Sequence, residues 1–81
     1  MWVEPRDHKI VGGILAAARR RTNLTQDELA ARLGKPQSFV SALEAGKRRV
    51  DVIEFLLIVR TLGADPVEIF TEISASSTTR R

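Results

Sequence analysis

The chain has 81 residues, one histidine and no cysteine, and its formal net charge is +3 at pH 7. This length is typical of one domain near the lower limit for a self-sufficient core. The composition excludes disulfides and thiolate metal sites and leaves no zinc cluster, so we expect no metal and no cofactor. No apolar run is long enough to cross a membrane, and the N-terminus lacks the order of a signal peptide, so we expect a cytoplasmic protein.

Charge is distributed unevenly along the chain. Residues 1–50 contain ten Lys and Arg against five Asp and Glu, whereas residues 51–81 contain three against five. A one-sided basic surface favours a polyanionic partner such as nucleic acid. A solvated surface that serves only solubility explains the same balance, and charge alone leaves both interpretations open.

Apolar residues recur at helical spacing throughout the sequence, which predicts an all-α fold. The first helix is expected over about residues 8–22, after an N-terminal arm of residues 1–7. Gly12 and Gly13 are expected to weaken this helix, by roughly 1 kcal/mol each relative to alanine. Its apolar stripe is formed by Ile10, Ile14, Leu15 and Ala18.

The second and third helices are separated by a very short connection. The second has a capping box formed by Thr25 and Glu28, and it ends at Gly34. The third is expected over about residues 36–45, before Gly46. The connecting residues Gly-Lys-Pro are too few for anything but a tight turn, and two helices joined in this way are typical of DNA-reading helix-turn-helix geometry.

The fourth helix is expected over residues 51–62, opening at Asp51 with Glu54 three residues on, and it carries two sets of apolar side chains. Ile53 and Leu57 form a second apolar stripe away from the core side. A core wider than a simple helical wheel explains this stripe, and so does a two-fold dimer interface that includes Val67 on the fifth helix. The set expected to face the core is Val52, Phe55, Leu56, Val59 and Leu62.

The fifth helix is expected to open at Asp65, with Glu68 at the capping-box position, and to end near Ile73. Residues 74–81 are small and polar without periodicity, which predicts a flexible tail. The sequence therefore predicts one compact domain over residues 8–73, between an arm and a tail.

One face of the third helix presents only small or polar side chains. These are Gln37, Ser38, Ser41 and Ala42. Glutamine can pair with adenine through two hydrogen bonds, serine can bind base edges or phosphate, and alanine can contact a thymine methyl group. The alternative is an ordinary solvated helix face without a binding role.

The segment LTQDELAARLGKPQSFVSALEAGKRRVD, continued by TLGADPVEIF, resembles the Cro/C1-type (xenobiotic-response-element, XRE) helix-turn-helix family. The resemblance covers about residues 10–73, in three segments with the family's order and spacing. It implies a five-helix, lambda-repressor-like DNA-binding domain with the helix-turn-helix at helices two and three. It also implies a transcriptional regulator, a repressor or autoregulator, that binds double-stranded DNA as a homodimer on a palindromic operator.

The resemblance also implies roles for individual residues. Base contacts are expected from Gln37, Ser38, Ser41 and Ala42. Phosphate contacts are expected from Gln26, Lys35, Lys47, Arg48 and Arg49. Arg19 and Glu44 match an ion pair that ties the first helix to the end of the third. Pro36 stands where the family commonly has a serine or threonine cap, which leaves the exact start of the third helix open.

Two other classes of protein compete with this interpretation. A protein-interaction module, such as an antitoxin, would use the second apolar stripe and the tail to hold a protein partner, and DNA binding would be secondary. An enzyme would need nucleophilic or metal chemistry, for which a chain without cysteine or tyrosine and with one histidine lacks the groups. We therefore expect no enzyme.

Overall fold

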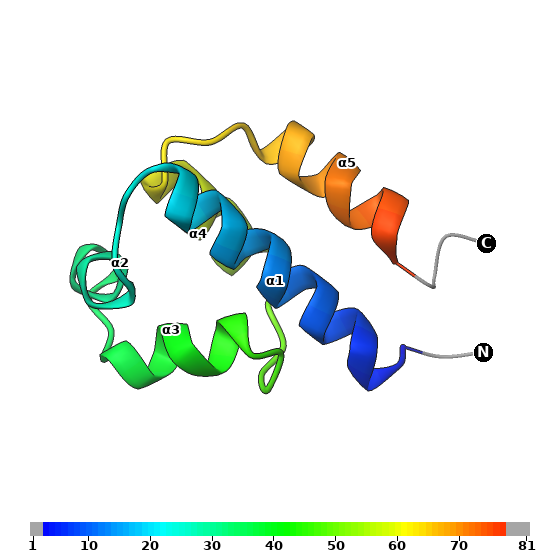
Figure 1. Ribbon diagram of the computed structural model, residues 1–81, viewed down its shortest axis with the longest axis horizontal. Helices are drawn as coiled ribbons and strands as arrows, with labels where there is room; N and C mark the ends of the chain where they lie inside the picture. Colours follow the sequence, from blue (N-terminus) through cyan, green and yellow to red (C-terminus); the bar gives the residue numbers. More distant parts are fainter. Residues whose placement is uncertain (1–2, 78–81) are drawn as a thin grey trace.

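The computed structural model describes residues 3–77, which form five α-helices and no strand (Figure 1). The helices are α1 (Pro5–Arg21), α2 (Gln26–Leu33), α3 (Gln37–Glu44), α4 (Val52–Thr61) and α5 (Pro66–Ser76). The predicted all-α, five-helix fold is confirmed. None of these helices, within the described residues, is long and apolar enough to cross a membrane.

Helix α1 lies between α3 and α5 and packs against both (Figure 1). Helix α2 packs against α3 and α4, and α4 packs against α5. As a result, α3 and α5 lie on opposite sides of the molecule, and the surface around one is separate from the surface around the other (Figure 1).

The predicted capping boxes of α2 and α4 are confirmed. The Thr25 hydroxyl accepts from the Glu28 N–H at 3.1 Å, and the Glu28 carboxylate accepts from the Thr25 N–H at 2.8 Å. Asp51 and Glu54 form the same reciprocal pair at the start of α4. Each box satisfies backbone donors that have no partner inside the helix, which fixes where the helix begins.

Helix α1 begins three residues earlier than predicted, at Pro5. Glu4 is the N-cap residue and forms a capping box with Asp7, whose carboxylate accepts from the Glu4 N–H at 3.2 Å. The fixed φ of proline suits the first helical position, so Pro5 extends the helix. Residues 5–7 therefore belong to α1 and not to an arm, and residues 1–2 of the predicted arm lie outside the described residues.

Helix α5 is longer than predicted and ends at Ser76. Ser77, the next residue, is buried, and its hydroxyl donates to the Asp7 carboxylate at 3.3 Å. This contact with the start of α1 holds the last turn of α5, so residues 74–77 do not form the predicted tail; residues 78–81 lie outside the described part of the chain. At the other end of α5, the Asp65 carboxylate accepts from the Val67 N–H and not from that of Glu68.

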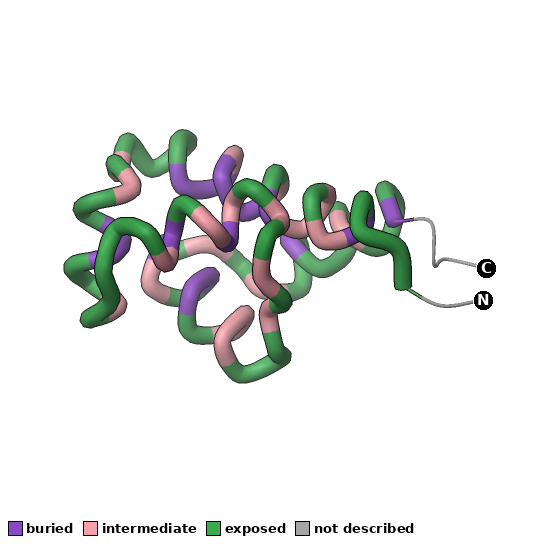
Figure 2. Tube along the Cα trace, turned by 90° about the horizontal axis from the view of Figure 1, so that it is seen from below, coloured by how far each residue is buried: buried purple, intermediate pink, exposed green. Residues whose placement is uncertain are grey.

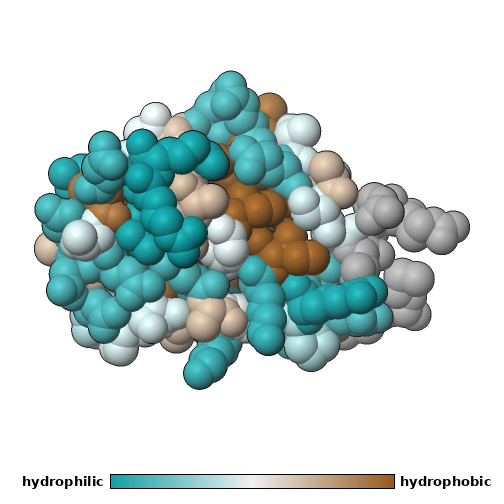
Figure 3. Space-filling model, in the orientation of Figure 1, coloured by the Kyte–Doolittle hydropathy of each residue, from teal (hydrophilic) through white to brown (hydrophobic). Residues whose placement is uncertain are grey.

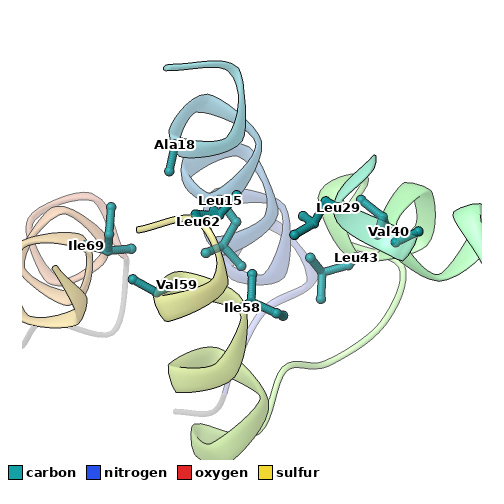
Figure 4. Packing of buried hydrophobic residues seen from close by; sticks show 10 residues of the cluster. Leu15, Ala18, Leu29, Val40, Leu43, Ile58, Val59, Leu62 and Ile69 are labelled. Atoms are coloured by element: carbon teal, nitrogen blue, oxygen red, sulfur yellow. The ribbon is translucent and has the colours of Figure 1, made fainter. Parts of the chain in front are cut away.

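The hydrophobic core draws side chains from all five helices (Figure 4). Burying each of the larger ones contributes about 1.5–3 kcal/mol relative to exposure. In Figure 2, buried positions alternate with exposed ones along the helices, as expected for amphipathic helices around one core. The buried set includes Leu15, Leu29, Val40, Leu43, Ile58, Val59, Leu62 and Ile69.

The prediction that Val52, the first residue of α4, faces the core is wrong. Val52 is 72% exposed, whereas Ile58, which was not among the predicted core residues, is buried. The buried side of α4 is centred on Ile58 and Val59, so the first residue of the helix lies beyond the core. The apolar surface of α4 is consequently larger than the sequence indicates.

Candidate nucleic-acid interface

The turn between α2 and α3 determines how α3 is presented. Gly34 adopts a left-handed conformation with φ 69°, which ends α2. Pro36 has an extended conformation and is the N-cap of α3, so the helix begins at Gln37 and not at Pro36. Proline has no side-chain acceptor that could cap a helix, and the Phe39 N–H instead donates to the Pro36 carbonyl at 3.0 Å. The turn places the Gln37 side chain at the open N-terminus of α3.

The polar face of α3 is accessible. Gln37, Ser38 and Ser41 are exposed and Ala42 is half-buried. Val40 and Leu43, on the opposite face, are 0% and 1% exposed. The structure thus brings the four predicted base-contacting residues onto one surface, and their contact with bases stays a prediction.

Gln37 is not an isolated surface side chain. Its Nε2 donates to Oε1 of Gln26, the first residue of α2, at 2.6 Å. Gln26 in turn donates from Nε2 to Oε1 of Glu44 at 2.8 Å. Neither hydrogen bond was predicted, because Gln26 and Gln37 are 11 residues apart and only the packing of α2 against α3 brings their side chains together.

Arg19 and Glu44 form the expected ion pair between α1 and the end of α3. The Arg19 Nε and Nη2 atoms lie 2.6 and 3.0 Å from the two carboxylate oxygens of Glu44. The side chains are only 10% and 7% exposed. The hydrogen bond to Glu44 raises the pKa of Arg19 above its ordinary value, against the effect of burial. Arg19 also donates to the Leu24 carbonyl at 2.7 Å, which ties the α1–α2 turn to the same point.

The basic loop after α3 is anchored by Arg48. Its guanidinium donates to both carboxylate oxygens of Glu54 at 3.2 Å each and lies 4.5 Å from the centroid of the Phe39 ring. The hydrogen bond from Arg48 is the largest cause that lowers the pKa of Glu54, followed by the hydrogen bond from the Asp51 N–H. Glu54 therefore holds Arg48 in place and partly compensates its positive charge.

The other cations around α3 are more open. Lys47 and Arg49 are exposed beside Arg48 at the C-terminal end of α3. Lys35 is exposed before its N-terminal end, with Nζ 5.4 Å from the Phe39 ring centroid. Positive charge therefore flanks the small polar face at both ends, which is the distribution that orients a domain on a phosphate backbone.

The predicted dimer candidates lie away from this surface, on α4 and α5. Ile53, Leu57 and Val67 are 72%, 57% and 72% exposed. Val67 also forms part of the wall of an apolar groove of about 420 Å³ between α4 and α5, together with Val52 and Phe70. Figure 3 shows apolar side chains open to solvent between α1 and α5, surrounded by hydrophilic ones.

Comparison with known proteins shows to which class of protein this five-helix domain belongs. A helix-turn-helix family model matches residues 15–69, which include the whole of α2, α3 and α4. The protein is a helix-turn-helix protein. A solved XRE-family-like protein from Pseudomonas syringae pv. tomato is 44% identical, with a TM-score of 0.76 over 86% of this chain and 85% of that one. The chain belongs to the Cro/C1-type (XRE) helix-turn-helix family of DNA-binding transcription regulators.

Two further relatives support this assignment. The HTH-type transcriptional regulator y4dJ of Sinorhizobium fredii is 41% identical over 63 residues, which are 78% of this chain and 82% of y4dJ. The clp gene regulator ClgR from C. glutamicum is 25% identical, with a TM-score of 0.82 over 94% of this chain and 99% of that one. These relatives are transcription regulators, a non-enzymatic class.

Proposed function

We propose that this protein is a repressor or autoregulator that binds double-stranded DNA in a sequence-specific manner, with α3 in the major groove. The observation that carries the proposal is the accessible small polar face of α3 with cations at both of its ends. A helix face without bulky or acidic groups can approach the base edges in the major groove, while the flanking cations contact the phosphates on either side of the groove.

The proposed contacts divide into two kinds. Bases are read by Gln37, Ser38, Ser41 and Ala42. Phosphates are bound by Gln26, Lys35, Lys47, Arg48 and Arg49. Arg48 uses the N–H groups that do not bind Glu54, and its fixed position sets the register of the loop on the backbone. Phosphate contacts hold the domain in place, and base contacts give the sequence preference.

We further propose that the protein binds a palindromic operator as a homodimer. The support is the exposure of Ile53, Leu57 and Val67 on α4 and α5, since large apolar side chains left in water on a small domain often mark a protein–protein interface. A two-fold dimer would present two α3 helices to half-sites about 34 Å apart, one turn of DNA.

Selection of bound sequences from a random pool of duplex DNA tests this function. The proposal predicts enrichment of an inverted repeat whose half-sites are spaced by about one helical turn. Recovery of a sequence-independent pool at physiological salt would contradict it, because non-specific binding through phosphates enriches no sequence.

A second candidate function is supported by the apolar groove between α4 and α5. A protein-interaction module of the antitoxin type would use this groove for a protein partner and bind DNA only as a secondary activity. A monomer that selects no DNA sequence, but forms a stable complex with the product of a neighbouring gene, would favour this candidate.

A further inference from the structure

Four side chains from three helices form a continuous series of hydrogen bonds that ends on the polar face of α3. Arg19 donates from Nε and Nη2 to the two oxygens of Glu44. Gln26 Nε2 donates to Oε1 of Glu44 at 2.8 Å, and Gln37 Nε2 donates to Oε1 of Gln26 at 2.6 Å. The series, which we call the amide relay, leads from an ion pair that is 10% and 7% exposed to an exposed glutamine.

The chemistry of Glu44 fixes the direction of every hydrogen bond in the amide relay. An ionised carboxylate accepts hydrogen bonds and cannot donate them. Gln26 must therefore turn its amide nitrogen toward Glu44, which leaves its oxygen facing Gln37. That oxygen can only accept, so Gln37 must present its own nitrogen to Gln26.

The amide relay thereby determines which atom of Gln37 is left for a ligand. The Oε1 atom of Gln37 is free to accept, and Nε2 retains one hydrogen that Gln26 does not bind. An exposed glutamine without such partners presents its oxygen or its nitrogen in the same place, because the two ends of the amide have nearly the same shape. Gln37 in this fold has one preferred orientation.

An amide with its oxygen directed outward distinguishes between bases in the major groove. Adenine N6 and cytosine N4 are donors, whereas guanine O6 and thymine O4 are acceptors that would face the Gln37 oxygen without a hydrogen bond. The remaining hydrogen on Nε2 can bind N7, an acceptor that adenine has and cytosine lacks. The arrangement therefore suits a base with an amino group, and adenine best.

We propose that Arg19 and Glu44, acting through Gln26, hold the amide of Gln37 in the orientation that selects an amino base over a keto base. This inference rests on the proposed function, because it requires that Gln37 faces a base. Arg19 and Glu44 are then positioning residues: they lie under the surface, yet they determine which base the surface accepts.

The test compares A·T with G·C at one position of the selected operator. That position is the one where Gln37→Ala removes the base preference. Adenine and guanine share N7 and differ in N6 against O6, so the ratio of the two affinities reports the orientation of the Gln37 amide. The wild-type protein is expected to prefer A·T by about 5- to 150-fold, the discrimination that one good bidentate contact gives.

Gln26→Ala breaks the amide relay without touching the buried ion pair, and we expect this ratio to fall at least about 5-fold toward unity. Glu44→Gln, checked for folding by circular dichroism, is expected to lower the ratio as well, because its new amide can donate to or accept from Gln26. Lys47→Ala is the matched control: it lowers the affinity for both sequences alike and leaves the ratio unchanged.

The possible outcomes distinguish a failure of this inference from a failure of the proposed function. If Gln26→Ala and folded Glu44→Gln both keep the wild-type ratio, or if the wild-type protein prefers guanine or thymine at this position, the inference is wrong and the proposed function stands. If the wild-type protein shows no base preference at any position, the proposed function is wrong and the inference falls with it.

Discussion

Gly12 of α1 lies directly against the backbone of Glu44 in α3. A Cβ atom on Gly12 would come within 2.6 Å of the Glu44 carbonyl oxygen, and the Leu43 carbonyl oxygen is closer still. This close crossing of two helices brings Glu44 to α1, where its side chain meets Arg19. By helix propensity alone, Gly12 is a weak point in α1, but its place in the fold allows the backbones of α1 and α3 to approach closely.

Gly12→Ala is expected to destabilise the protein by about 1–3 kcal/mol, because the helices must move apart to admit the methyl group and the gain in helix propensity is smaller than that strain. Chemical denaturation followed by circular dichroism measures the change in the free energy of unfolding.

Gly13→Ala is the matched control for this substitution. A Cβ atom on Gly13 would meet no described atom within 4 Å, so the variant is expected to gain up to about 1 kcal/mol from helix propensity. Equal changes in the two variants would contradict the assigned role of Gly12, since the neighbouring glycines differ only in what lies beside them.

Sequence patterns predicted most of this fold because the helix starts are encoded locally. The capping boxes at Thr25 and Asp51 need only two side chains three residues apart, and both formed as expected. The start of α1 was placed three residues too late although its capping box, formed by Glu4 and Asp7, is local as well. The end of α5 was wrong because a distant contact decides it. The last turn of α5 is held by the contact of Ser77 with Asp7, 70 residues away, and no local pattern reports that contact.

The residues of the candidate site could be predicted from the sequence, but the hydrogen bonds between them could not. Spacing placed the small polar residues of α3 on one face, because the period of a helix fixes which side chains share a side. The hydrogen bonds from Gln37 to Gln26 and from Gln26 to Glu44 span 11 and 18 residues, and they depend on how three helices meet. Likewise, nothing local indicates that Arg48 binds Glu54 across the loop.

Removal of one member of the buried ion pair is expected to destabilise the protein strongly. Arg19→Ala leaves the Glu44 carboxylate without its cation in a site that is 7% exposed, and we expect a loss of about 3–5 kcal/mol in the free energy of unfolding. Arg21→Ala is the control, because Arg21 pairs with Glu72 at 3.9 Å on the surface, where such pairs contribute about 0–1 kcal/mol. Similar losses for both variants, measured by urea denaturation, would contradict this difference.

The titration of Glu54 reports whether Arg48 is anchored in solution. Arg48 and the Asp51 N–H lower the pKa of Glu54 below its ordinary value of 4.5. A lowered folded-state pKa stabilises the protein above the unfolded-state pKa, and this stability is lost as the pH falls through the folded-state pKa. In Arg48→Gln, we expect the pKa to move up toward 4.5 without reaching it, because the Asp51 hydrogen bond remains.

Carbon-13 shifts of the Glu54 carboxyl group, followed from neutral to acid pH, measure this change. Arg49→Gln removes a neighbouring charge that does not pair with Glu54 in the structure, and it is expected to leave the titration where it is in the wild-type protein. An unchanged pKa in Arg48→Gln would show that Arg48 is not held by Glu54.

The proposed homodimer is expected to depend on the apolar stripe of α4. Leu57→Glu places a charge on a side chain that is 57% exposed and would lie in the interface, so the dimer should dissociate to a folded monomer. Analytical ultracentrifugation at micromolar concentrations measures the mass. Ala31→Glu, the same change of charge on an exposed position of α2, is the control and should remain dimeric. A wild-type monomer at high micromolar concentration would contradict the dimer.

The central claim is that α3 reads bases while the flanking cations bind phosphate. The most direct test is the affinity of the wild-type protein, Gln37→Ala and Lys47→Ala for a selected operator and its single-base variants, across a range of salt concentrations. We expect Gln37→Ala to lose about 1–3 kcal/mol on one preferred base. Lys47→Ala should weaken binding to all sequences alike and reduce the salt slope by about 1. If Gln37→Ala weakens every sequence equally, α3 does not read the base assigned to it.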